Sequence, residues 1–244
     1  FENITALSSN WEVDTTGNGR VSISSASSPD TGSGHLLLDA QDPNSVPSLS
    51  SATLSVNMTR LANAKLTFRE KEFNDSDDPM PGQFTKSSNS DGVAISYDGG
   101  STWYRLMSLT GTQSSNFYRT FSFDLNAQAT TNGQKLGSDV RIRFQNYSRN
   151  PAGSGGMAFD NISVTGTYVN NPPTLTKVIP LTGAIESTPY TIPFAVLQFA
   201  ADEADPDGDP TFFKITSVNN GTLLKNGLPV TPGTTFNVGE ALEW

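Results

Sequence analysis

Short apolar runs that alternate with polar residues make up most of this 244-residue chain. In residues 52–58, 93–97 and 140–144 apolar side chains recur at every second position. That period places them on one face of an extended strand, whereas a helix repeats every three to four residues. The one helical stretch, near 125–136, contains Gly133 and two threonines, so we expect no more than a loose turn there. Without crossover helices, the pattern predicts an all-β fold, an antiparallel jelly-roll sandwich.

A proline-rich stretch divides the chain into two predicted domains. A strand that ends at Tyr168 is followed by Asn-Asn-Pro-Pro, and paired prolines extend and stiffen a joint. We therefore expect a jelly-roll domain over 1–168, a linker over 169–173 and a smaller immunoglobulin- or cadherin-like β domain over 174–244.

The second predicted domain is short for its class. Strands are expected at 190–192, 194–197 and 212–215. An immunoglobulin-like sandwich usually needs about 100 residues. We therefore expect an incomplete domain, either cut from a longer protein or completed by a strand from a partner chain.

Composition excludes some function classes and favours an extracellular setting. The net charge of −9 would repel phosphate backbones, which argues against nucleic acid as a partner. There is no cysteine, and the chain contains no run of about 18 apolar residues, the length that a membrane span needs. The acidic, Ser/Thr/Asn-rich composition fits a secreted or cell-surface bacterial protein, and a start at Phe1 without Met suggests a processed or excerpted chain.

Five carboxylates fall within the eight residues 202–209. Asp205, Asp207 and Asp209 are separated by Pro and Gly rather than by lysines that would neutralise them. Such a cluster repels itself unless a cation occupies it, and hard carboxylate ligands suit calcium. The alternative is an acidic turn without metal, because the same residue types favour turns.

Three isolated acids form a second candidate set. Glu2 begins the chain, Asp39 ends the apolar run 36–38, and Asp160 follows Phe159. Acids at the ends of apolar strands are candidate ligands for one metal that joins both chain ends of a sandwich. Each of them equally fits a residue that caps a turn or accepts a backbone N–H bond.

Signals for catalysis are weak. His35 is the only histidine, no nucleophile motif accompanies it, and we expect it on the surface or on an edge strand. Glu70 and Glu72 lie on one strand face about 7 Å apart, with Arg69 and Lys71 on the other face as at a solvated strand end. The spacing alone does not indicate a glycosidase pair, so we predict that the protein is not an enzyme.

Residues 96–103 match the Asp-box pattern S-x-D-x-G-x-T-W, which predicts a structural hairpin. This hairpin and the blocks 1–2, 37–39, 91–95 and 158–164 resemble MAM-type and related concanavalin-like jelly rolls of bacterial surface proteins. The resemblance covers about residues 1–168. It implies a sandwich for adhesion or glycan contact with a structural cation near the paired chain ends, which favours Glu2, Asp39 and Asp160 as calcium ligands.

Residues 171–173, Glu186, 205–209 and 220–223 resemble the cadherin-like tandem repeats of large bacterial adhesins. In joints of that type an early Glu and a D-x-D pair bind calcium. The resemblance therefore implies Glu186, Asp205 and Asp207 as ligands, with Asp209 as a further candidate.

The function we expect is a calcium-binding structural or adhesive segment of a large secreted or cell-surface protein. Its partners would be surface or matrix glycans or neighbouring copies of itself. One alternative is a carbohydrate-binding module of a polysaccharide-degrading enzyme, with Trp103, Phe117, Tyr118 and Tyr147 as candidate aromatic platforms. The other is a filament subunit completed by a donated strand.

Overall fold

The computed structural model describes residues 7–43, 46–74, 78–109 and 117–244. The chain divides into two compact units, Phe1–Val169 and Asn170–Trp244, at the start of the predicted linker. Each unit is described by itself.

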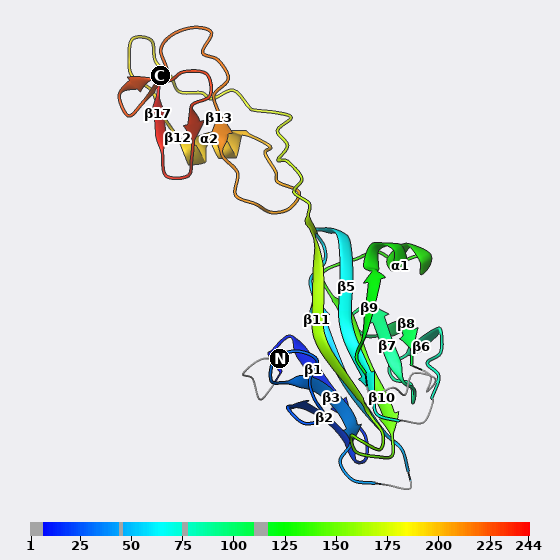
Figure 1. Cartoon of the computed structure of the whole chain (residues 1–244). Helices are drawn as coiled ribbons and strands as arrows, with labels where there is room; N and C mark the ends of the chain where they lie inside the picture. The colour runs from blue at the N-terminus through cyan, green and yellow to red at the C-terminus, as the bar shows by residue number, and fades with distance from the viewer. Residues whose placement is uncertain (1–6, 44–45, 75–77, 110–116) are drawn as a thin grey trace. The chain divides into compact units, whose positions relative to one another are not determined.

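The first unit is a sandwich of two antiparallel sheets (Figure 1). The six-stranded sheet has the order β1 (Trp11–Thr15), β4 (Ser48–Val56), β10 (Val140–Ser148), β7 (Gly92–Ser96), β8 (Thr102–Ser108) and β6 (Gln83–Thr85). The five-stranded sheet has the order β2 (Gly19–Ser24), β3 (His35–Ala40), β11 (Met157–Tyr168), β5 (Leu61–Glu72) and β9 (Arg119–Asp124). All these pairings are antiparallel, and successive strands cross between the sheets, as from β3 to β4 to β5. The predicted all-β antiparallel sandwich is confirmed.

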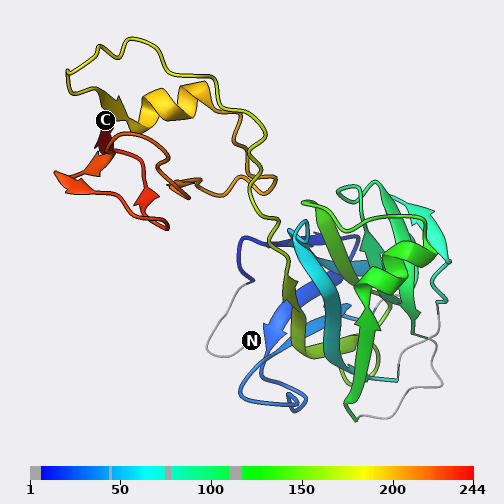
Figure 2. The same ribbon diagram turned by 90° about the horizontal axis from the view of Figure 1, so that it is seen from above.

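The core lies between the two sheets and contains the apolar side chains that alternate along the strands. Its fully buried members include Leu66, Phe68, Val93, Ile95, Val140, Ile142, Phe144 and Phe159. At its centre the ring of Phe144 lies 5.4 Å from that of Phe68 and 4.9 Å from that of Phe159. Phe68 belongs to β5 and Phe159 to β11, which lie side by side in Figures 1 and 2, so these contacts join both sheets.

A helix of seven residues, α1 (Leu125–Thr131), follows β9 where only a loose turn was expected. Asp124 caps it by accepting the N–H of Ala127 at 2.9 Å. Leu125 and Ala129, one turn apart, are both buried. The cap and this apolar pair stabilise the helix despite the two threonines in its last turn.

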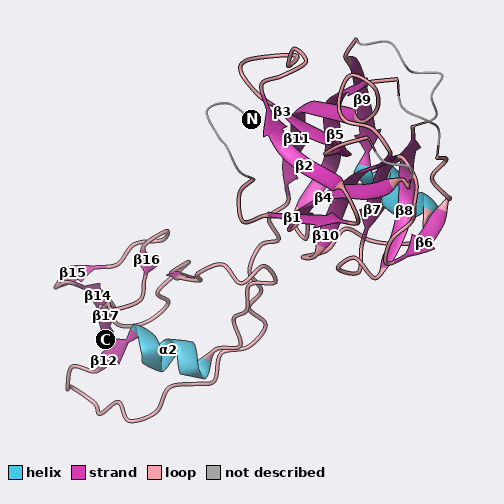
Figure 3. Cartoon of the chain, turned by 90° about the horizontal axis from the view of Figure 1, so that it is seen from below, coloured by secondary structure: helices cyan, strands magenta, loops and turns pink. Residues whose placement is uncertain are grey.

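The second unit combines a small sheet, a strand pair and one helix (Figure 3). The sheet has the order β12 (Thr191–Pro193), β17 (Ala241–Glu243), β14 (Leu224–Lys225) and β15 (Leu228–Pro229), and β13 (Phe213–Lys214) pairs with β16 (Thr235–Phe236). Its core contains Phe194, Phe236 and Leu242.

The strand predicted at 194–197 is wrong, because these residues begin helix α2 (Phe194–Ala200). Phe194 and Leu197 both pack on the small core, at the spacing of one helical turn. A short apolar run fits either a strand or a buried helix face, so its period did not distinguish them.

Among the described residues no helix is long and apolar enough to cross a membrane.

Candidate functional site

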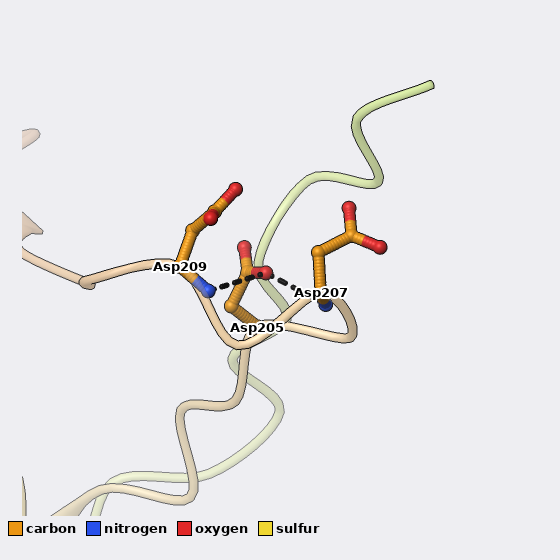
Figure 4. Close-up of side chains that lie close together, drawn as sticks. All are labelled: Asp205, Asp207 and Asp209. Carbon is orange, nitrogen blue, oxygen red and sulfur yellow. Dashed lines mark hydrogen bonds between the residues drawn. The ribbon is translucent and has the colours of Figure 1, made fainter. Parts of the chain in front are cut away.

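The predicted acidic loop of the second unit brings three carboxylates together (Figure 4). Asp205, Asp207 and Asp209 each offer one oxygen, and these oxygens all lie within 4.8 Å of one another. Asp205 Oδ1 accepts the N–H groups of Asp207 at 2.8 Å and of Asp209 at 3.2 Å. Gly208, with φ of 76°, allows the chain to turn back in this way. The loop therefore offers carboxylate oxygens to a hard cation, although two backbone N–H groups of the loop already bond Oδ1 of Asp205.

Among the predicted ligands of the second unit, Asp207 also bonds Asn171, and Glu186 lies outside this loop. Asp207 accepts the backbone N–H of Asn171 at 2.6 Å and its side-chain amide at 3.1 Å. Glu186 is not part of the carboxylate cluster and instead lines an open cavity together with Trp244. The structure thus brings together three of the four acids predicted there and leaves Glu186 out.

Asp39, predicted as a calcium ligand of the first unit, is fully buried and neutralised by a guanidinium. Arg20 donates from Nε to Oδ1 at 2.9 Å and from Nη2 to Oδ2 at 2.7 Å. The N–H of Ala152 adds a third bond to Oδ2 at 2.8 Å. The hydrogen bond from Arg20 to Asp39 raises the pKa of the Arg20 guanidinium, although partial burial opposes this. The carboxylate therefore anchors the segment near Ala152 to β2 and β3.

Asp160 is also buried, and its carboxylate organises the loop that precedes β3. Its Oδ2 accepts the N–H groups of Asp30 at 2.9 Å and Thr31 at 3.2 Å. Continuing the β3–β11 register places Asp160 beside His35 and Asp39 beside Gly156. The two carboxylates are then four residues apart along the strands, roughly 13 Å.

The structure therefore does not bring Asp39 and Asp160 together around one ion. Glu2 lies outside the described residues. The calcium site at the chain ends stays a prediction that this geometry does not favour.

His35 lies in the interior of the five-stranded sheet, so its predicted surface or edge position is wrong. Its Nδ1 lies 2.6 Å from the hydroxyl of Tyr118. Burial lowers the pKa of His35 to about 4, the charge of Lys71 acts in the same direction, and Asp160 opposes both. Lys71 Nζ bonds the carbonyls of Ser27 and Ser28, so a loop covers the sheet face that the sequence suggested was solvated.

The Asp-box hairpin joins β7 to β8 with the expected hydrogen bonds. Asp98 Oδ1 accepts the hydroxyl of Ser96 at 2.8 Å and the N–H of Thr102 at 2.9 Å. Slight burial of Asp98 opposes ionisation, but these bonds prevail and lower its pKa. Trp103 is fully buried, with the guanidinium carbon of Arg143 3.9 Å from its ring centre. Trp103 is thus a covered structural residue, and the prediction that it is a sugar platform is wrong.

The outward face of β1, β4 and β10 carries a polar surface that we call the outer band. The outer band consists of Glu12, Asp14, Ser51, Thr53, Arg141, Arg143, Gln145 and Tyr147. Its two acids are exposed, its two arginines and Tyr147 are half-buried, and Ser51, Thr53 and Gln145 are buried beneath neighbouring segments. These residues alternate with the core residues Ala52, Ile142 and Phe144, and therefore point away from the core.

Strand register arranges the outer band in two rows. Glu12, Thr53 and Arg143 lie opposite one another across the three strands. Asp14, Ser51 and Gln145 form the next row. Each row therefore sets a carboxylate, a hydroxyl and a guanidinium or amide side by side.

Hydrogen bonds fix the outer band in place. Arg143 Nη1 donates to the carbonyl of Lys86 at 2.6 Å, and Gln145 Nε2 donates to those of Ser88 at 2.9 Å and Ser90 at 2.7 Å. Burial lowers the pKa of Arg143, although nearby carboxylates oppose this. Tyr147, half-buried, follows Gln145 on the same face. Its own N–H is bonded to Asp91 Oδ1 at 2.7 Å.

From the sequence, Tyr147 was a candidate sugar contact, but the other residues of the outer band were not predicted. The signal was present in 141–147, where Arg, Arg, Gln and Tyr alternate with core residues. Which strands flank β10, and therefore which polar groups complete the rows, depends on pairing with residues some 90 positions earlier in the chain.

No family model and no curated protein matches the chain. Among solved structures, the enzymatically active domain of bacteriophage CBA120 tailspike protein 4 matches at a TM-score of 0.40 and 14% identity, over 65% of this chain and 20% of that one. TmCBM61, solved with β-1,4-galactotriose, matches at a TM-score of 0.37 and 11% identity, over 65% of this chain and 90% of that one. The family 11 carbohydrate-binding module of the cellulase Lic26A-Cel5E of Clostridium thermocellum matches at a TM-score of 0.37 and 14% identity, over 65% of this chain and 88% of that one. The chain spans only a fifth of the tailspike domain, and TM-scores this low carry no argument about function.

Proposed function

We propose that the first unit is a non-catalytic carbohydrate-binding module of a secreted or cell-surface protein, and that the outer band binds the sugar. The observation that supports this is the row arrangement beside Tyr147. Sugar hydroxyls can donate to the exposed carboxylates of Glu12 and Asp14 and accept from the half-buried guanidinium groups, and charge-assisted bonds of this kind are the stronger ones. An aromatic ring such as that of Tyr147 can cover an apolar sugar face while its hydroxyl stays in water.

The position of the titratable groups supports binding rather than hydrolysis. His35 is buried against Tyr118, and Glu70 and Glu72 are only 1% and 2% exposed. A general acid must reach the glycosidic oxygen directly or through one water molecule. A polysaccharide on the surface of the sandwich would not reach these groups.

The test is the affinity of the intact chain for a panel of soluble polysaccharides, measured by affinity electrophoresis and isothermal titration calorimetry. Replacing Tyr147→Ala should weaken binding about tenfold, the equivalent of about 1.4 kcal/mol. Tyr168→Ala is the matched control, because Tyr168 is 57% exposed but lies at the end of β11 in the other sheet. Equal losses in both variants, or no binding to any polysaccharide, would contradict the proposal.

A second proposal concerns the acidic loop. We infer that Asp205, Asp207 and Asp209 bind Ca²⁺ and stabilise the second unit, which would give the chain a structural role on the cell surface. The 4.8 Å clustering of their oxygens supports this. Self-association through a donated strand stays a prediction.

Calorimetric melting with calcium or with EDTA tests this second proposal. At calcium concentrations 100 times Kd, binding to the folded state alone adds about 2.7 kcal/mol to the free energy of unfolding. Asp207→Asn should abolish the calcium-dependent shift of the second unit, whereas Glu186→Gln, an exposed acid outside the cluster, should retain it. If the melting temperature of the second unit is the same with calcium as with EDTA, this second proposal is refuted.

A further inference from the structure

The second unit contains a cavity of about 590 Å³ beside the end of β17. One wall is the segment 184–189, and the other consists of Thr222, Leu224, Glu243 and Trp244. Small-molecule sites have volumes of about 300–1,000 Å³ and combine an aromatic or apolar lining with a few polar groups. The cavity therefore has the size and the kind of lining that a ligand site needs.

Backbone contacts hold Trp244 in place at this cavity. Its N–H donates to the carbonyl of Tyr190 at 2.9 Å, and its own carbonyl accepts the N–H of Tyr190 at 3.0 Å. The indole ring lies so close to Gly221 that a Cβ built on this glycine would come within 2.4 Å of Cζ2. Trp244 is nevertheless 45% exposed. Part of the ring is thus packed against the chain, while the rest is open to a ligand.

The wall 184–189 is tied to the same residues. Within it, the N–H of Thr188 donates to the carbonyl of Ile185 at 3.1 Å and closes a turn. Tyr190, which pairs with Trp244, also donates from its hydroxyl to the carbonyl of Thr182 at 2.8 Å. The segment is therefore held on both sides, and hydrogen bonds fix the position of this wall.

The charged side chains of the cavity are all negative. Glu186 and Glu243 line it, and Glu243 lies opposite Leu224, another lining residue, in the β14–β17 register. Among the described residues that line the cavity there is no lysine, arginine or histidine. Lys225, next to Leu224 in the sequence, pairs instead with Glu240 at 2.8 Å. A positively charged ligand would therefore meet two carboxylates without a competing cation.

We propose that this cavity binds an organic ammonium ion against the indole ring of Trp244. A cation over the face of a tryptophan ring is attracted by the electrons of the ring, and quaternary ammonium ligands are recognised in this way. The two glutamates add an attraction that an uncharged ligand of the same shape would lack. This site is separate from the outer band and from the loop at Asp205, so it depends on neither sugar nor calcium binding.

Choline is the probe, and the control ligand is its uncharged isostere dimethylbutanol, in which carbon replaces the nitrogen. Each is titrated in EDTA into the ¹⁵N-labelled full chain, and the indole N–H signal of Trp244, identified with Trp244→Phe, is followed by NMR. We expect a saturable shift with choline and about tenfold weaker binding of dimethylbutanol.

Variants test the two parts of the site separately. Glu186→Gln should weaken choline binding about threefold, the effect of an exposed ion pair, whereas Glu203→Gln, which removes the same charge outside the cavity, should not. Gly221→Ala should abolish binding, because its methyl group would take the place of the ring. If Gly221→Ala does not fold, the glutamate variants still decide the question.

Three results would overturn the proposal. The first is the absence of a saturable shift with choline. The second is dimethylbutanol that binds as tightly as choline, which would mean that the cavity selects apolar shape and not charge. The third is equal weakening by Glu186→Gln and Glu203→Gln, which would reduce the effect to the net charge of the second unit.

Discussion

The substitution Arg20→Met should destabilise the first unit, because it leaves the buried carboxylate of Asp39 without its cationic partner. Arg20 supplies two of the three hydrogen bonds to Asp39, which is fully buried. Removing one partner of a buried pair costs about 3–5 kcal/mol because the other charge stays uncompensated. The Arg20 side chain is 39% exposed, so water replaces part of the interaction. We therefore expect a loss below that range, about 2–3 kcal/mol.

The assay is urea unfolding of the first unit, followed by tryptophan fluorescence, to which Trp11 and Trp103 of this unit contribute, and checked by calorimetry. A double-mutant cycle with Asp39→Asn isolates the coupling between the two side chains. The double variant should recover much of the loss, because no buried charge remains.

A loss below about 0.5 kcal/mol would refute this reasoning, since surface pairs contribute in that range. Calcium that restores the stability of Arg20→Met would refute it differently, by showing that the pocket of Asp39 accepts a metal ion.

Three further predictions follow from individual contacts. The stability that Glu70 contributes to the first unit should be lost as pH rises from about 4.5 to about 8, because its raised pKa favours the protonated folded state; the difference between the parent and Glu70→Gln in urea titrations at each pH measures this contribution, at most about 5 kcal/mol. The contribution of His35 has the opposite sign and should be lost as pH falls from 6.5 towards 4, because His35 is held neutral in the folded state; a His35→Gln variant with the same acid dependence as the parent would contradict this. Asp98→Ala should cost about 1 kcal/mol by removing the acceptor for Thr102, and thermal melting that matches the parent would count against a structural Asp-box.

The sequence was informative where local pattern decides the structure. Alternation at Val140, Ile142 and Phe144 predicted the core face of β10. The Asp-box spacing predicted the hairpin before Trp103 because its donors and acceptor lie within eight residues.

The sequence was uninformative where distant segments cover a surface. His35 owes its burial in part to Tyr118, 83 residues away, and Glu70 faces the core because β11 pairs with β5 almost 90 residues later. Asp39 is neutralised by Arg20, whose partnership depends on the register of β2 with β3. Charge spacing alone cannot distinguish an acid that binds a metal from one that binds an arginine.

Helix α2 shows a different limit. Residues 194–197 are apolar and bounded by proline, which suits a strand, but the small core of the second unit accepts Phe194 and Leu197 only at helical spacing. Tertiary packing decides such short segments, and propensity is a weak guide to them.

The most direct test of the proposed function maps bound sugar onto the surface by amide chemical shifts. The ¹⁵N-labelled full chain is titrated with oligosaccharides from whichever polysaccharide it retains. We predict that the largest shifts fall on the outer band, at Glu12, Thr53, Arg143 and Tyr147. Shifts confined to the five-stranded sheet or the second unit, or none with any glycan, would contradict it.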